Sequence, residues 1–281
     1  MKPLCNYSLP MSSTTRSFIE STLYALIRLS PALAALLVIE LPSDPTQATL
    51  IIGRLLILFI ILVTWNMTEG TLMLWLKAKQ AYKAQARGYA IVAAIFGVCV
   101  LLLFQFFRIR ASQELFILLL AALSLRGMSR AGWEQGRPQV AIITTFVGHT
   151  LTALLSLLCC FSELSWPMAT FALAIGAAVS AVEMTWNTLK LTGPGALRWV
   201  PALFRVTLVL GPLLVATMAL LGQLSPHYVL VYATLFLVIP ILRGLAKRGA
   251  GIPHSLRGVA GVYLLFVAIM IGCRLYISNS N

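Results

Sequence analysis

Long apolar stretches alternate with short polar ones along the whole chain, which predicts a bundle of membrane-spanning helices. Nine such stretches can be separated, at residues 22–40, 50–68, 88–107, 112–125, 138–161, 166–186, 200–222, 227–244 and 257–275. Most approach the roughly 20 apolar residues that a helix needs to cross a bilayer. Because lipid offers the backbone no hydrogen-bond partner, each span is expected to be helical. The pattern therefore predicts an all-α, polytopic membrane protein with about nine transmembrane helices.

The fourth span is the shortest, with about 14 residues before Arg126. We expect its helix to continue through Leu125 and Arg126 into the cytosolic headgroup layer. There the long arginine side chain can keep its charged head in a polar environment.

The positive charges lie almost entirely on alternate connections between the spans. Roughly 17 of the 21 lysines and arginines fall on the N-terminal side, and the others are Arg54, Arg108, Arg110 and Arg274. Cytoplasmic loops of membrane proteins carry this excess, which predicts an N-terminus inside and a C-terminus outside. The net charge of +13 is then explained by anionic lipid headgroups. We therefore expect membrane lipids, and no nucleic acid, as partners.

Nothing between the spans resembles a soluble domain. Residues 1–281 are expected to form a single transmembrane domain, with a flexible cytosolic tail at 1–18 that lacks the features of a cleavable signal. The expected location is a bacterial inner, or cytoplasmic, membrane. The five cysteines show no metal-ligand spacing, and the neighbours Cys159 and Cys160 are expected to be buried, inert thiols.

A repeated triplet marks the cytosolic ends of two spans. Thr64-Trp65-Asn66 ends the second span and Thr185-Trp186-Asn187 ends the sixth. Two copies in the same orientation, four spans apart, favour a parallel repeat of spans two to five with spans six to nine. Chance similarity is the alternative.

Glu183 is the most informative acidic residue, because it lies inside the last apolar turn of the sixth span. An ionisable group there is costly unless it faces a partner or a wet cavity. Helical spacing places Asn187 and Lys190 on its face, and places Asn66 beside Glu69 at the end of the second span. We expect these two helix ends to surround one cavity open to the cytosol.

Basic residues at the end of the fourth span suggest which ligand this cavity binds. Arg126 and Arg130, four residues apart, share a face after the fourth span. Carboxylates and phosphates together can hold a divalent cation, and Arg or Lys can neutralise the remaining phosphate charge. The alternative is structural: Glu183 pairs with Lys190 or with an arginine of a neighbouring span. His149, in mid-span, is expected to form a hydrogen bond between helices.

Several motifs resemble the UbiA superfamily of intramembrane prenyltransferases. The first span contains Arg28 and Pro31 in "IRLSPALAALL", and "LRGMSRAGWEQGR" follows the fourth span. The nine spans and the inside N-terminus are similar to that family too. The family has an N-D-x-x-D-type motif ending its second helix and a D-x-x-x-D motif ending its sixth, where magnesium bridges the aspartates to a prenyl diphosphate.

At the matching places this chain reads "NMTEG" and "EMTWN". The first keeps the asparagine but shifts the acid to Glu69, and the second keeps the spacing as Glu-x-x-x-Asn. The chain's one aspartate, Asp44, lies on the opposite side. The motif match is therefore degenerate, although the topology match covers nearly the whole chain.

The resemblance implies a UbiA-like fold and transfer of an isoprenoid group from a prenyl diphosphate to a hydrophobic acceptor in the membrane. It implies Mg²⁺ as cofactor and Glu69 and Glu183 as catalytic residues. The metal ligands would be Asn66, Glu69, Glu183 and Asn187, and the diphosphate would be bound by Lys77, Arg126, Arg130 and Lys190. The missing aspartates leave open a non-catalytic protein of the same fold that binds or helps transport a lipid-like molecule.

The charge asymmetry makes the topology testable. In a cysteine-free background, cysteines replacing Lys83 or Arg248 should react with a membrane-impermeant reagent only after the cells are opened. A cysteine replacing Asp44 should react in intact cells and serves as the matched control. Labelling of position 83 or 248 from outside would show that the predicted orientation is wrong.

Overall fold

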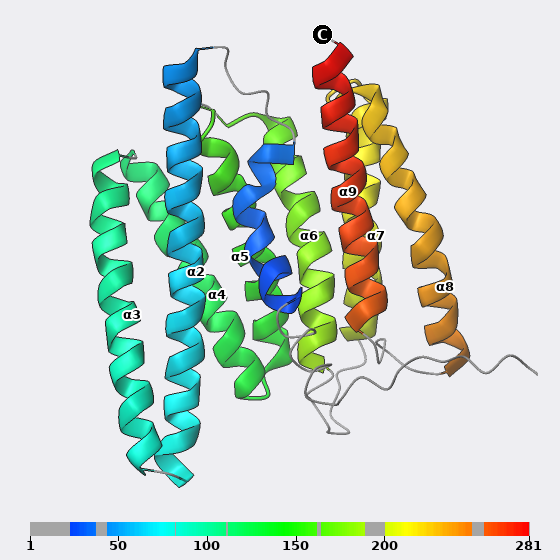
Figure 1. The fold of residues 1–281 in the computed structure, drawn as a ribbon. Helices are drawn as coiled ribbons and strands as arrows, with labels where there is room; N and C mark the ends of the chain where they lie inside the picture. The colour runs from blue at the N-terminus through cyan, green and yellow to red at the C-terminus, as the bar shows by residue number, and fades with distance from the viewer. Residues whose placement is uncertain are drawn as a thin grey trace, which may run out of the picture.

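The computed structural model describes residues 23–37, 44–81, 83–110, 112–161, 164–188, 200–248 and 256–280. These residues are almost entirely helical, and none of them forms a strand (Figure 1). The N-terminal helix, Leu23–Leu37, is followed by α2 (Pro45–Ala81), α3 (Lys83–Arg110), α4 (Gln113–Glu134), α5 (Pro138–Leu158), α6 (Trp166–Thr188), α7 (Val200–Leu220), α8 (Ala233–Arg248) and α9 (Leu256–Ser280). Two 3₁₀ helices, η1 (Ser30–Leu37) and η2 (Pro226–Tyr232), end the N-terminal helix and precede α8.

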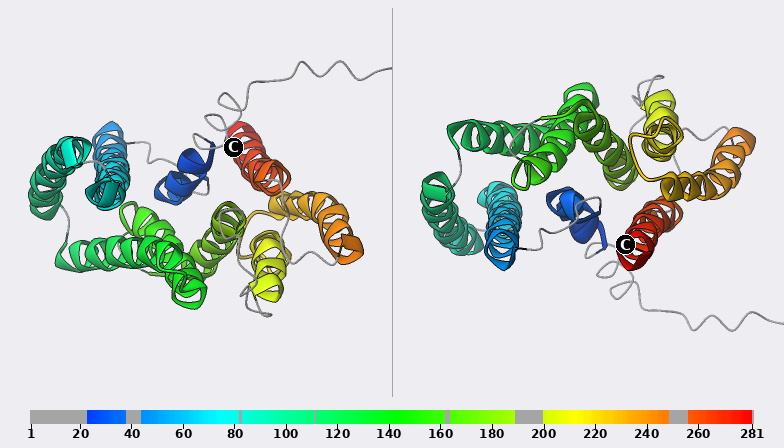
Figure 2. Two further views of the ribbon diagram at one scale, coloured as in Figure 1. Left: turned by 90° about the horizontal axis from the view of Figure 1, so that it is seen from below. Right: turned by 90° about the horizontal axis from the view of Figure 1, so that it is seen from above.

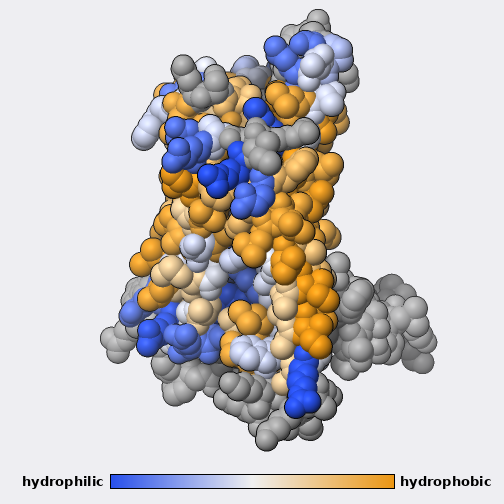
Figure 3. Space-filling view, turned by 90° about the vertical axis from the view of Figure 1, so that its left-hand side faces the viewer, coloured by the Kyte–Doolittle hydropathy of each residue, from blue (hydrophilic) through white to orange (hydrophobic). Residues whose placement is uncertain are grey.

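The all-α, polytopic prediction is confirmed by the length and composition of these helices. Eight described helices are long and apolar enough to cross a membrane, and Leu23–Leu37 is a shorter apolar helix. Hydrophobic side chains dominate the middle of the face shown in Figure 3, and hydrophilic ones gather toward its two ends. The chain is therefore an integral membrane protein. Its orientation stays a prediction.

Two predicted boundaries need correction. The segment after the second span is not a loop: α2 continues to Ala81 and α3 begins at Lys83, as a long antiparallel pair (Figure 1). Because alanine, lysine and glutamine are strong helix formers, both helices extend beyond their apolar parts. The fourth helix does continue past Arg126, to Glu134. Its arginine is buried between helices, with 1% of its surface exposed, and does not reach toward headgroups.

The N-terminal helix occupies the middle of one layer of helices, between two longer ones. Seen along the helix axes, it stands between α2 and α9, with α5 and α6 across from it (Figure 2). It packs against all four of these helices. A side chain projecting from the N-terminal helix can therefore contact several helices at once.

Side chains of other helices fix this short helix through its backbone. A 3₁₀ segment begins at Ser30–Pro31, where proline cannot donate a hydrogen bond. The amide of Ala35 donates to Ser156 Oγ of α5 at 2.9 Å. Carbonyl groups at its end accept from Tyr228 of η2 and Arg274 of α9. These bonds satisfy buried backbone groups that would otherwise lack a partner.

Glycine allows α5 and α6 to approach closely at Gly176. A Cβ placed on Gly176 would lie 2.9 Å from both the Cα and the backbone nitrogen of Thr150, and closer still to its hydroxyl. Real carbon atoms do not approach a neighbouring backbone that closely. Small residues at such crossings are typical of membrane helices, whose association depends on close packing.

The neighbouring thiols after α5 are unreactive in this environment. Cys159 is buried and Cys160 half-buried. Burial raises the pKa of each thiol to about 12. Both groups therefore stay protonated at neutral pH. Cys99 is exposed, so the expectation of burial does not extend to every described cysteine.

One added methyl group should separate α5 from α6. Gly176→Ala must move helix backbone and should destabilise the fold by about 1–3 kcal/mol, the usual cost of overpacking. Gly97→Ala in α3 adds the same atom where nothing lies within 4 Å. Thermal unfolding in detergent should show a lowered midpoint for Gly176→Ala and an unchanged midpoint for Gly97→Ala. Equal midpoints would contradict the close packing.

A buried cluster of arginine and glutamate side chains as candidate functional site

Five charged side chains meet where the C-terminal halves of α2, α4 and α6 approach the N-terminal helix. Arg28, Glu69, Arg126 and Glu183 are between 1% and 7% exposed. The side chain of Arg130 is 29% exposed. We call these five residues the charged cluster. Ionisable groups at such depth are costly unless they are paired, and they commonly mark functional sites in membrane proteins.

Arg28 of the N-terminal helix lies between the two acids. Its NH1 group is 3.2 Å from Glu69 Oε2, and its Nε is 3.6 Å from Glu183 Oε2. Arg130 NH1 approaches the same oxygen of Glu69 at 3.8 Å. The predicted convergence of Glu69 and Glu183 is thus present. It is mediated by a guanidinium group that stands between α2 and α6.

Glu183 has a second set of partners on α4 and α5. Its Oε2 lies 2.6 Å from His149 Nε2, and its Oε1 accepts a 3.4 Å hydrogen bond from Ser129. Since a carboxylate only accepts, Nε2 of His149 is assigned the hydrogen. The prediction of a hydrogen bond between helices at His149 is therefore confirmed. Glu183 also pairs with Arg28 of another helix, as the structural alternative predicts, but the role of that pair stays a prediction.

Arg126 is the member of the charged cluster that has no carboxylate partner among the described residues. Its NH2 group donates to the carbonyl oxygen of Arg28 at 3.1 Å and to Asn66 Oδ1 at 3.5 Å. Its Nε and NH1 have no hydrogen-bond partner among the described residues, and none of the described ion pairs includes it. The charged cluster thus holds three arginines and two glutamates, and a third glutamate, Glu134, lines the cavity beside it.

A cavity of about 210 Å³ opens beside the charged cluster. Its wall is made by charged and aromatic side chains together: Tyr24, Arg28, Arg130, Trp133, Glu134, Glu183, Trp186 and Asn187. Tyr24 stacks on Trp186, with ring centroids 4.9 Å apart. Because one water occupies about 30 Å³, this volume suits a small polar head group and not a long apolar tail.

The structure brings most of the predicted site residues together. Asn66, Glu69, Arg126, Arg130, Glu183 and Asn187 all lie in or against the charged cluster. Lys77 lies on α2 about 12 Å beyond Glu69, at 1.5 Å per residue, and its side chain is outside the described part. Lys190 is outside the described residues. Both copies of the repeated triplet reach the site, but whether they form a repeat stays a prediction.

The donor set does not fit a magnesium ion as it is arranged. Magnesium needs near-octahedral oxygen ligands at about 2.0–2.1 Å, whereas a guanidinium group lies between the two carboxylates here. Within the described ranges no group of three or more histidine, cysteine, aspartate or glutamate side chains is placed to hold a metal. The guanidinium nitrogens of Arg126 that lack a described partner match an anion better than a cation.

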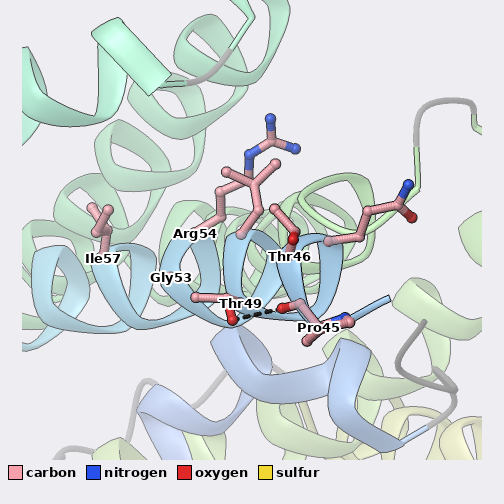
Figure 4. A pocket seen from close by; sticks show the side chains of 8 residues that line it. Pro45, Thr46, Thr49, Gly53, Arg54 and Ile57 are labelled. Carbon is pink, nitrogen blue, oxygen red and sulfur yellow. Dashed lines mark hydrogen bonds between the residues drawn. The ribbon is translucent and has the colours of Figure 1, made fainter. Parts of the chain in front are cut away.

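A larger cavity, of about 580 Å³, lies elsewhere, along the N-terminal end of α2 (Figure 4). Its described lining comes from residues 45–57, including Arg54, whose side chain extends away from the helix in that view. Arg54 is separated from Glu69 by about 22 Å along α2 at 1.5 Å per residue. None of the predicted site residues lines this cavity, so size alone does not identify the functional site.

Comparison with protein-family models, with curated proteins and with solved structures found no match to this chain. The chemistry of the site therefore has to be inferred from its own contacts. Sequence reasoning did not include Arg28 among the site residues, although an arginine three residues before Pro31 within an apolar span is itself a signal of a buried partner. Tyr24 and Trp133 gave no such signal, because aromatic residues near a membrane interface are common.

Arg28 should be essential to the stability of the described arrangement. Arg28→Met leaves two buried carboxylates without their shared base, and breaking a buried pair costs about 3–5 kcal/mol. Removing one acid as well, in Arg28→Met/Glu69→Gln, should restore part of the loss. Thermal unfolding in detergent measures both changes. Arg54→Met is the control, and a loss as large in that variant would argue against a special role for Arg28.

Proposed function

We propose that this protein binds the anionic head of an isoprenoid diphosphate at the charged cluster and transfers the isoprenoid group to a hydrophobic acceptor in the membrane. The observation that carries the proposal is the guanidinium group of Arg126, which is buried without a carboxylate partner. Leaving a buried charge uncompensated is strongly unfavourable. A phosphate group supplies both the missing charge and the missing hydrogen-bond acceptors.

The arrangement suits a diphosphate in particular. Guanidinium groups match phosphate oxygens with paired hydrogen bonds. Arg28 and Arg130 line one cavity, and Arg126 contacts the backbone of Arg28 beside it. The surrounding apolar bundle keeps the isoprenoid tail in the hydrocarbon region. Binding from the cytosolic side follows from the predicted orientation and is part of the proposal.

The transfer itself needs stabilisation of a leaving group. The allylic C–O bond breaks with its electron pair going to the diphosphate, the acceptor forms a bond to that carbon, and the acceptor loses a proton. Arg28, Arg126 and Arg130 would stabilise the charge that develops on the diphosphate, which fixed cations do well in a water-poor site. The resemblance also implies magnesium, and the transfer assay below therefore includes arms with and without it.

A second candidate function is binding or transport of a lipid-like anion without catalysis. Two observations favour it: both acids are engaged by bases, and the paired aspartates of the UbiA-like motifs are absent. Binding is common to both candidates, so the experiments separate binding from transfer.

Arg126→Gln should weaken binding of geranylgeranyl diphosphate by about 10- to 100-fold. The loss corresponds to a charged hydrogen-bonding contact of about 1.5–3 kcal/mol. Purified full-length protein in detergent and radiolabelled ligand suffice for the measurement. Arg205→Gln, which removes an exposed arginine of α7, is the matched control. If the wild type binds no geranylgeranyl diphosphate, either with or without magnesium, the proposal is wrong.

Transfer is then tested with the same labelled ligand and a membrane lipid extract as the source of acceptor. A prenyltransferase should release inorganic diphosphate and move the label into a new lipid product, and Arg126→Gln should abolish both. Binding without either product, in magnesium and in EDTA, would favour the non-catalytic candidate.

A further inference from the structure

We propose that Glu69 and Glu183 are internal counter-ions that hold Arg28 and Arg130 until an anionic head group takes their place. The inference rests on the proposed function and gives the two acids a role opposite to that of metal ligands. In this view the ligand competes with the protein's own carboxylates for the arginines. The acids lower the affinity of the site for anions instead of creating it.

The N···O distances in the ion pairs of the charged cluster are long enough for the arginines to exchange their carboxylate partners for a ligand. A tight charge-assisted N–H···O bond measures about 2.7–2.9 Å. The contacts of Arg28 with the two acids measure 3.2 and 3.6 Å, and that of Arg130 with Glu69 measures 3.8 Å. Long contacts of this kind contribute less than tight ones, so a phosphate oxygen at closer range displaces them.

Each acid keeps a neutral partner when its arginine leaves. Glu69 Oε1 accepts a hydrogen bond from the indole nitrogen of Trp65, on the same helix. Glu183 keeps His149, at 2.6 Å, and Ser129, at 3.4 Å. Since a carboxylate without any partner would be costly to bury, these second partners are what makes the exchange feasible. An acid that served only as an ion-pair partner would not need them.

The arginines are reachable from the cavity that the ligand would enter. Arg28 and Arg130 both line it, together with Glu183. Arg130 is the most exposed member of the charged cluster, at 29% of its side chain. Arg126 needs no exchange, because its Nε and NH1 already lack a partner among the described residues. A diphosphate in the cavity has enough oxygens to replace both carboxylates at Arg28 and Arg130, and Arg126 lies next to Arg28, whose carbonyl oxygen it contacts at 3.1 Å.

The two roles for the acids predict opposite effects of the same substitution. If Glu69 and Glu183 hold a metal bridged to the diphosphate, replacing either with glutamine weakens binding. If they are internal counter-ions, Glu69→Gln or Glu183→Gln frees an arginine and strengthens binding in the absence of metal. Glutamine keeps the size and hydrogen-bonding capacity of the side chain while removing its charge.

The test measures binding of inorganic pyrophosphate by calorimetry, with EDTA present, to the purified full-length protein in detergent. Each glutamine variant should bind about ten-fold more tightly than the wild type, which corresponds to about 1.4 kcal/mol. Glu114→Gln, at the exposed start of α4, removes the same charge and should leave the affinity unchanged. Adding Arg130→Gln to Glu69→Gln removes an arginine that the first substitution frees and should abolish the gain, which excludes loose binding to this basic chain.

Either glutamine variant loses stability if its arginine stays unpaired, so a second readout accompanies the first. Ligand binding to the folded state raises its apparent stability. Pyrophosphate should therefore raise the unfolding midpoint of the variants more than that of the wild type. Weaker or unchanged binding and stabilisation in both variants overturns the counter-ion role alone, provided that the wild type binds through Arg126. No binding to the wild type or to any variant overturns the proposed function as well.

Discussion

The cost of burying charge in an apolar bundle is the constraint on which the rest of this structure depends. Arg28 meets it by contacting acids from two different helices at once, and its backbone carbonyl accepts a hydrogen bond from Arg126. One residue thus links α2, α4 and α6. The main structural contribution of the N-terminal helix is consequently to place Arg28 between the two acids. Its inner position between α2, α5, α6 and α9 follows from that role.

Much of the fold could be predicted from the sequence, because the requirement for internal backbone hydrogen bonding leaves few choices in lipid. Apolar length located every described helix. The boundaries failed where polar residues with high helix propensity extend α2 and α3 beyond their apolar parts, and where Arg126 lies between helices and not among headgroups. Hydropathy measures transfer into lipid, and it does not register a charge that is paired inside protein.

The sequence predicted which residues form the candidate site more successfully than it predicted their chemistry. Helical spacing grouped Glu183 with Asn187 and Glu69 with Asn66, and the structure brings both pairs to the charged cluster. What spacing could not show is that a third helix inserts an arginine between them. Contacts between residues far apart in the chain, such as Arg28 with Glu183, depend on the order in which helices pack around one another. No local pattern encodes that order.

The bonds that hold the N-terminal helix also have a consequence for how the protein is made. They come from Ser156 of α5, Tyr228 of η2 and Arg274 of α9, so the last of them requires α9. During synthesis the first helix enters the membrane long before these partners exist. Until then Glu69 and Glu183 lack a base that is fixed in position. The helix that carries Arg28 is therefore fixed in position only after α9, which follows it far along the sequence, has taken its place.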